Sequence, residues 1–265
     1  MTTLNEKIES SKVINDYITF EHPLNETMRI CLLLEQLFNQ VKEDINNIST
    51  DSHAKHSVDT IIRIIHVLDR PDLRGKLSKA LAQQANSLSQ LENNPQVNQD
   101  KLTSILSEID LTYDALHENK NKISEQLKSN KIIKSILQYS ASPGGPANFN
   151  IPNYLLWLNK NNQQKKQDMR SWINSFEVIK SAVTILLRLT RNSQNLAPRY
   201  ANNSFFQVNL DSQPITQLIR VKIGTVENVW PEISVGRHRL AIYFKNYDES
   251  EANTSDIKFA LACCY

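Results

Sequence analysis

The sequence predicts an α+β protein, in which a mostly helical N-terminal bundle is joined to a C-terminal domain of antiparallel β-strands. As far as about residue 192, apolar residues recur at the three- and four-residue spacing of amphipathic helices. From Ser193 onward they alternate with polar residues, which is the period of a half-buried strand. Only 5 glycines and 9 prolines among 265 residues favour long regular elements over a loop-rich fold.

Three segments are expected along the chain. Residues 1–19 form a leader that is weakly ordered or loosely docked, residues 20–140 form the helical domain, and residues 141–265 form the strand domain. Two helices, at about 153–158 and 168–192, are expected as insertions in the strand domain. Hydrophobic residues make up 40% of the chain, which is enough to build a packed core and excludes wholesale disorder.

The helical domain is expected to contain five helices. Pro23 suits the first turn of the first helix, because its missing N–H costs nothing there. Glu21 and His22 precede it, and we expect them to cap or anchor the helix start rather than form a catalytic pair. Pro71 ends the second helix, since the residue before a proline avoids the helical conformation. The apolar stripes of the five helices begin at Met28, Val58, Leu73, Leu102 and Ile123.

The helical pattern is interrupted at the start of the strand domain. Pro143–Pro146 holds two of the five glycines and predicts a tight turn. Phe149–Pro152 predicts a short edge strand, where proline is tolerated. A short helix, a polar loop over 159–167 and a long helix from about Asp168 to Asn192 follow. The strands expected after that helix are Phe205–Leu210, Gln217–Ile223, Arg237–Lys245 and Ile257–Cys263.

Two of these strands carry a basic face, because successive side chains in a strand point to opposite sides. In the first, Arg220 and Lys222 share one face. In the second, His238, Leu240, Ile242 and Phe244 are expected to face the core. Its other face presents Arg237, Arg239, Ala241 and Tyr243. Two such rows on adjoining strands would form a patch suited to a carboxylate-bearing partner, although an ordinary solvated sheet surface has the same composition.

The net charge of +2 conceals a division of charge along the chain. Residues 1–119 carry 11 basic and 18 acidic side chains, whereas residues 120–200 carry 13 basic and 3 acidic ones. The basic block 120–200 is a candidate surface for an acidic partner, and nucleic acid is the alternative partner. Two observations weaken that alternative, namely a pI of only about 8.3 and no recognisable aromatic RNA-binding motif. The two charged parts could also pair with each other.

No motif in the sequence predicts catalysis, a cofactor or a metal site. HExxH, CxxC, GxSxG and glycine-rich phosphate loops are all missing. Of the three cysteines, Cys263 and Cys264 are adjacent and would face opposite ways in a strand, so structural thiols in a reducing cytoplasm are expected. We expect neither a membrane span nor a secretory signal.

Several short motifs resemble the ZapD family of bacterial cell-division proteins, and they recur in order from Phe20 to the end of the chain. They are Phe20-Glu-His-Pro-Leu-Asn-Glu26 with Met28-Arg29, Pro143-Gly-Gly145, Phe149-Asn-x-Pro152, Trp157, Trp172-Ile173, Trp230-Pro231, Ile233-Ser234, Arg239-x-Ala-Ile242 and Leu261-Ala-Cys-Cys264. Each motif is weak alone, and together they are specific.

The resemblance implies a non-enzymatic cytoplasmic homodimer, found at the midcell division ring, whose fold joins a helical to a strand domain. It implies binding to the C-terminal peptide of the tubulin-like GTPase FtsZ, and bundling of FtsZ filaments. It also implies basic residues that hold the peptide. At matching positions of this chain these are Arg70, Arg74, Lys131, Arg220 and Arg239. Arg237 matches a basic position by type, and Tyr243 would lie beside apolar residues of the peptide.

Overall fold

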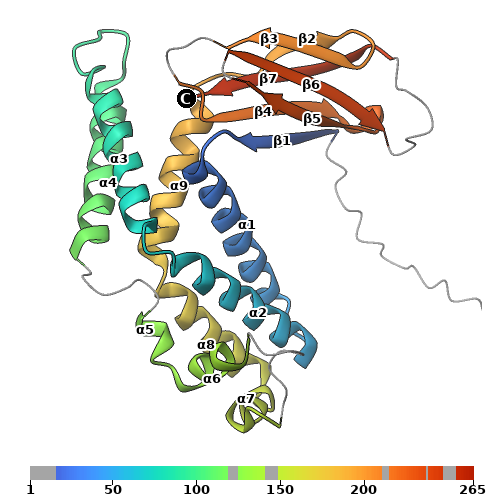
Figure 1. The fold of residues 1–265 in the computed structure, drawn as a ribbon. Helices are drawn as coiled ribbons and strands as arrows, with labels where there is room; N and C mark the ends of the chain where they lie inside the picture. Colours follow the sequence, from blue (N-terminus) through green and yellow to red (C-terminus); the bar gives the residue numbers. More distant parts are fainter. Residues whose placement is uncertain (1–15, 119–124, 141–148, 211–214, 237, 247–254) are drawn as a thin grey trace, which may run out of the picture. The chain divides into compact units, whose positions relative to one another are not determined.

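A computed structural model describes residues 16–118, 125–140, 149–210, 215–236, 238–246 and 255–265 (Figure 1). It has two compact units, which we call the helical unit (Asn25–Arg191) and the strand unit (Met1–Leu24 with Asn192–Tyr265). Helices up to Asn192 and antiparallel strands in both segments of the strand unit confirm the α+β class. The division differs from the expected one, because the helices foreseen as insertions in the strand domain lie in the helical unit.

The described part of the helical unit is built from helices of very different length. Asn25 caps the first, because its side-chain oxygen accepts a hydrogen bond from the backbone N–H of Met28 at 2.8 Å. Thr50 and Asn161 cap α2 and α8 in the same way. The helices are α1 (Glu26–Asn46), α2 (Asp51–Leu68), α3 (Leu73–Ser89), α4 (Gln99–Glu118), α5 (Glu125–Lys128), α6 (Lys131–Ser140), α7 (Pro152–Leu158), α8 (Asn162–Asn174) and α9 (Glu177–Asn192).

Two predictions in this unit were wrong. Residues 149–152 form no strand; Pro152 is instead the first residue of α7, where its missing N–H is harmless. The long helix is divided at Ser175, and its first half begins at Asn162, inside the expected loop. The Ser175 hydroxyl and its backbone N–H both donate to the Trp172 carbonyl, which ends α8 and turns Phe176 fully into the core. The expected turn at 143–146 lies outside the described residues.

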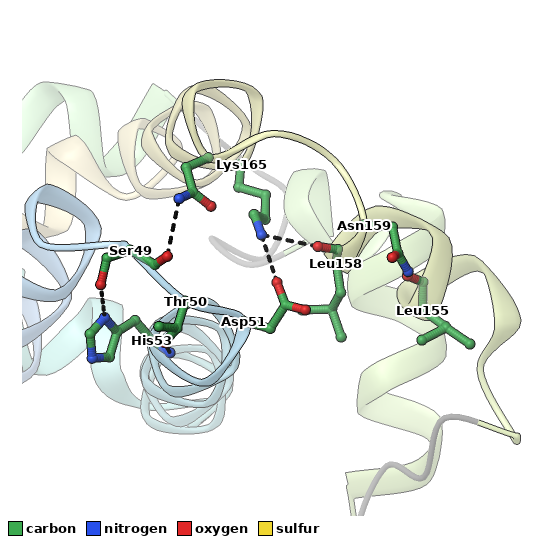
Figure 2. A network of polar contacts seen from close by, with 9 residues as sticks. Ser49, Thr50, Asp51, His53, Leu155, Leu158, Asn159 and Lys165 are labelled. Carbon is green, nitrogen blue, oxygen red and sulfur yellow. Dashed lines mark hydrogen bonds and ion pairs between the residues drawn. The ribbon is translucent and has the colours of Figure 1, made fainter.

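A buried lysine links three of these helices (Figure 2). The side chain of Lys165 in α8 is only 3% exposed. Its ammonium group donates to Asp51 Oδ1 at 2.8 Å and to the Leu158 carbonyl at 3.0 Å. Asp51 begins α2 and Leu158 ends α7, so a single cation satisfies a carboxylate and an unpaired helix-terminal carbonyl. Beside it, Asn162 donates to the Ser49 carbonyl at 3.3 Å, which reinforces the attachment of α8 to the start of α2.

The strand unit is a two-layered sandwich. We call the sheet ordered β1-β4-β7-β2 sheet A and the sheet ordered β3-β6-β5 sheet B; all pairings in both are antiparallel. One apolar cluster, separate from that of the helical unit, takes side chains from both sheets. The strands are β1 (Tyr17–Pro23), β2 (Ala197–Ala201), β3 (Phe205–Asn209), β4 (Leu218–Gly224), β5 (Val229–Val235), β6 (Arg239–Asn246) and β7 (Ile257–Cys264).

Four of these strands were predicted, and β1, β2 and β5 were not. Tyr17 to Thr19 belong to β1 rather than to a loose leader; residues 1–15 lie outside the described ranges. Glu21 and His22 also lie in β1, so neither caps the first helix. Trp230 and Pro231 lie in β5, an edge strand in which proline is tolerated.

Candidate partner-binding surfaces

The two rows of cations expected to form one patch belong to different sheets. Arg220 and Lys222 lie on β4 of sheet A, whereas Arg239 and Tyr243 lie on β6 of sheet B. The residues that alternate with them, such as Val221 in β4, are buried in the same core on both strands. The cationic side chains therefore point away from that core on opposite outer faces of the sandwich, and the prediction of a single patch on adjoining strands was wrong.

The outer face of sheet B carries an arginine and an aromatic pair, and we call Arg239, Tyr243 and Phe205 the sheet B surface. Arg239 and Tyr243 are exposed, and Ala241 lies between them on β6. Phe205 of β3 lies directly opposite Tyr243, and their ring centroids are 4.7 Å apart. Within the described ranges Arg239 forms no ion pair, so its guanidinium is available to an outside carboxylate.

One ion pair borders this surface among the described residues. Glu232 of β5 lies opposite Tyr243 and forms an ion pair with Lys245 at 2.7 Å. The lysine therefore offsets the acidic side chain that lies beside the tyrosine. Sequence reasoning missed both Phe205 and this pair, because the alternation of each strand was readable but the pairing of β3, β5 and β6 was not.

Two further predictions concern residues before β6: one was wrong, and the other concerns a residue outside the described ranges. His238 is exposed rather than buried, because the strand begins at Arg239, one residue later. The carbonyl of His238 accepts a hydrogen bond from the Leu210 N–H at 3.0 Å, so its backbone, not its ring, serves the fold. Arg237 lies outside the described residues.

Arg220 is not a free cation. Its Nε donates to Glu21 Oε1 at 3.0 Å, and the two side chains are only 21% and 17% exposed. Glu21 is the cross-strand partner of Arg220 in the β1–β4 register. The pair therefore fastens the edge strand β1 to sheet A, and a partner's carboxylate would have to compete with Glu21 for the guanidinium.

The remaining predicted residues all belong to the helical unit. Arg70, in the turn between α2 and α3, donates to Glu26 at 2.8 Å, and Arg74 follows in the first turn of α3. Lys128 of α5 forms an ion pair with Asp69, the residue before Arg70, at 2.6 Å. Lys131 begins the next helix, is exposed and has no ion pair among the described residues. These cations thus belong to neighbouring elements, though Arg70 already has an acidic partner.

Part of the basic block 120–200 is neutralised by acids from the first part of the chain. The ion pairs that join the two parts are Lys128–Asp69, Lys165–Asp51, Arg188–Glu108 and Arg191–Glu35. The last is bidentate, with N–O distances of 2.7 and 2.6 Å, and joins α9 to α1. Four of the 13 cations of the block therefore help to hold helices together, and the block offers fewer free cations to nucleic acid than its composition suggests.

Other kinds of site find little support in the described residues. No group of three or more His, Cys, Asp or Glu side chains there could hold a metal ion. Burial, with a smaller effect from Glu35 nearby, raises the pKa of the Cys31 thiol to about 12, so this cysteine is a poor nucleophile. None of the helices in those ranges is both long and apolar enough to span a bilayer.

Comparison with known proteins gives a consistent match. The family model ZapD, described as a cell division protein, matches residues 32–243. Cell division protein ZapD of Coxiella burnetii (strain RSA 493 / Nine Mile phase I) is 36% identical over 252 residues, covering 93% of this chain and 97% of the relative. Its namesake from Methylococcus capsulatus is 29% identical over 254 residues, covering 95% and 99%. This chain belongs to the ZapD family of cell division proteins.

Proposed function

We propose that this protein binds the C-terminal peptide of FtsZ and bundles FtsZ filaments, as a non-enzymatic cytoplasmic homodimer at the division ring. Membership of the ZapD family supports a role in cell division. The geometric observation that carries the peptide-binding part is the sheet B surface, where an arginine without an ion pair among the described residues shares one strand face with the exposed Tyr243, which packs on the half-buried Phe205. A short peptide with carboxylates and apolar side chains fits both features.

Arg239 would hold a carboxylate of the peptide through its planar fork of donors, which matches carboxylate geometry. Tyr243 is 48% exposed and Phe205 is half-buried against it, so the pair offers apolar area without having to move. Arg70, Arg74 and Lys131 are proposed as further contacts from the helical unit. Arg220, on the other outer face of the sandwich, would act through Glu21 by keeping β1 in place.

Bundling follows from two sites held in one dimer. Once one filament tail is bound, the second binding event is intramolecular, so weak single sites give strong cross-linking to polymerised FtsZ. The tail would lose conformational freedom on docking, which keeps the affinity of each site modest. Exposed cations are screened over about 8 Å at physiological ionic strength, so bundling should weaken as salt is added.

Co-sedimentation with polymerising FtsZ, with and without its C-terminal peptide, tests the proposal. Tail-dependent bundling that weakens with salt is expected, and loss of one charge-assisted contact in Arg239→Glu should reduce affinity by at least about tenfold. Arg63→Glu reverses an exposed charge on α2 and is the matched control. The proposal would be contradicted if the amount of co-sedimented protein did not change when the FtsZ peptide is removed. It would also be contradicted if Arg239→Glu bound FtsZ as tightly as Arg63→Glu.

A further inference from the structure

The outer face of sheet A carries a second surface, built from tyrosines and lysines. We call Tyr17, Lys222, Lys258 and Tyr200, with the small residues Gly224 and Ala260 between them, the sheet A platform. The two tyrosines are 58% and 63% exposed and lie on the two edge strands, β1 and β2. Lys258 is also exposed and Lys222 is partly so.

The strand register places these residues in two rows across the sheet. In the first row Tyr17 lies opposite Gly224 on β4, and Lys258 of β7 lies opposite Tyr200. In the second row Lys222 lies opposite Ala260. Adjacent strands are about 4.8 Å apart, so the backbones at the two tyrosines are about 14 Å apart across the four strands. Gly224 adds no side chain to the first row and Ala260 adds only a methyl group to the second, so the side chains of this face are mainly the two tyrosines and the two lysines.

The platform has positive charge that nothing described neutralises. Neither Lys222 nor Lys258 forms an ion pair within the described residues. The acid of β1 on the same face, Glu21, is already held by Arg220 at 3.0 Å. The Lys222 ammonium lies 4.6 Å from the centroid of the Tyr17 ring, which orients the tyrosine and leaves its other face to solvent.

We propose that the sheet A platform binds single-stranded nucleic acid. Single strands are held elsewhere by cations that follow the phosphates and by aromatic rings on which bases stack, and this face supplies both. Lysine binds phosphate as a point charge, whereas carboxylates are better held by the arginine fork. The available cations of the platform are lysines, and the neighbouring Arg220 is taken by Glu21, so the face favours phosphates over an acidic peptide.

The platform is separate from the surface proposed for the FtsZ peptide. Arg239 and Tyr243 lie on the opposite outer face of the sandwich, beyond the shared core. The two ligands could therefore be held at the same time, and the proposal does not rest on the proposed function. It also differs from binding through the cations of residues 120–200, because Lys222 and Lys258 lie outside that block.

Fluorescence anisotropy of a labelled oligothymidylate of about 12 nucleotides, titrated with the full chain, tests the proposal. Binding is expected at low salt. Each of Tyr17→Ala and Tyr200→Ala should raise Kd about 5- to 150-fold, the loss expected for one stacked base. Two phosphate contacts predict a slope of log K against log salt of about −1.4, which should approach zero in Lys222→Gln/Lys258→Gln.

One substitution can block the platform without disturbing the sheet. A Cβ at Gly224 would meet only Val226 Cγ2 at 3.7 Å and the Asp16 carbonyl at 3.8 Å, which are ordinary contacts. Gly224→Glu should therefore fold and abolish oligonucleotide binding by placing a carboxylate among the lysines, whereas Gly224→Ala should retain it. Arg63→Glu, which reverses an exposed charge on α2, is the control that should leave binding unchanged.

Three results would overturn the proposal. The first is no anisotropy change at low salt, and the second is binding that the tyrosine and Gly224→Glu variants do not alter. The third is displacement of the oligonucleotide by an acidic peptide at equal charge concentration, which would identify the face as a peptide site. If Gly224→Glu loses oligonucleotide binding but still co-sediments with FtsZ, the two surfaces act independently.

Discussion

Lys165 and Asp51 give the sharpest test of what holds the helical unit together, because the two members of this ion pair differ greatly in exposure. The Lys165 side chain is 3% exposed, whereas that of Asp51 is 61% exposed. Removing the carboxylate would leave an ammonium group in the interior, hydrogen-bonded to the Leu158 carbonyl but without its counter-charge. Removing the ammonium would leave a carboxylate that water still reaches. The two deletions should therefore lower the free energy of unfolding by unequal amounts.

Deleting one partner of an ion pair costs about 3–5 kcal/mol when the other charge stays buried. We expect Asp51→Ala to lower the free energy of unfolding by about 3 kcal/mol, at the low end because water can enter from its exposed side. Lys165→Met keeps the apolar stem but leaves the Leu158 carbonyl without its donor, which costs about 2 kcal/mol. The double variant should be about as stable as Lys165→Met alone, since the ammonium that needs the carboxylate is gone.

Urea unfolding followed by tryptophan emission can measure these differences in the helical unit alone. Trp157 and Trp172 are both buried there, with ring centroids 5.3 Å apart. Trp230→Phe would remove the one tryptophan of the strand unit from the signal. Glu177→Ala, which breaks an exposed ion pair within α9, is the control and should change stability by less than about 1 kcal/mol.

Either of two outcomes would refute this account of the lysine. One is a loss of stability in Lys165→Met that equals or exceeds the loss in Asp51→Ala. The other is additivity in the double variant, because contacting residues that share a buried charge should couple by about 1–3 kcal/mol. Additivity would mean that the ammonium does not depend on Asp51.

Three further predictions concern other contacts. A double-mutant cycle on Arg191 and Glu35, whose bidentate pair is 24% and 32% exposed, should give a coupling energy of about 1–2 kcal/mol; a value near zero would contradict its role in joining α9 to α1. Asn25→Ala should cost about 1 kcal/mol in urea unfolding through loss of the α1 cap, and Asn25→Ser should restore most of it. The pKa of Cys31 is raised from 9.0 to about 12 in the folded chain, so its contribution to stability is complete below pH 9 and is lost toward pH 12. Unfolding free energy measured over that range should fall less in Cys31→Ala than in the parent; equal slopes would contradict the burial of the thiol.

Local pattern was sufficient to identify most helices and the inward faces of the predicted strands. Ile219, Val221 and Ile223 alternate with polar neighbours, and all three are buried as alternation requires. The division of the long helix at Ser175 was not foreseeable in the same way. No proline or glycine marks it, and it arises from hydrogen bonds to Trp172 that form once Phe176 enters the core.

Strand β1 shows a different limit of prediction from sequence. Its seven residues alternate like a strand, yet their partners on β4 lie far along the sequence, from Tyr17 opposite Gly224 to Pro23 opposite Leu218. A short segment beside a well-marked helix start reads as a leader when its partner cannot be seen. The strand unit is thus closed by a segment that comes from the far end of the chain.

The same limit explains why the basic rows were combined into one patch. Alternation within a strand indicates which residues face the core, but it does not indicate on which side of the core the strand lies. In a two-layered sandwich, residues that point away from the core in different sheets must diverge, so Arg220 and Arg239 cannot belong to one flat surface. Counting both sets of cations as one patch overstates the positive charge of each face. Considered separately, the two faces suit different ligands. An arginine on the same face as aromatic rings favours carboxylates, and lysines next to tyrosines favour phosphates. The function of each face then depends on the sheet order, which the alternation of single strands does not contain.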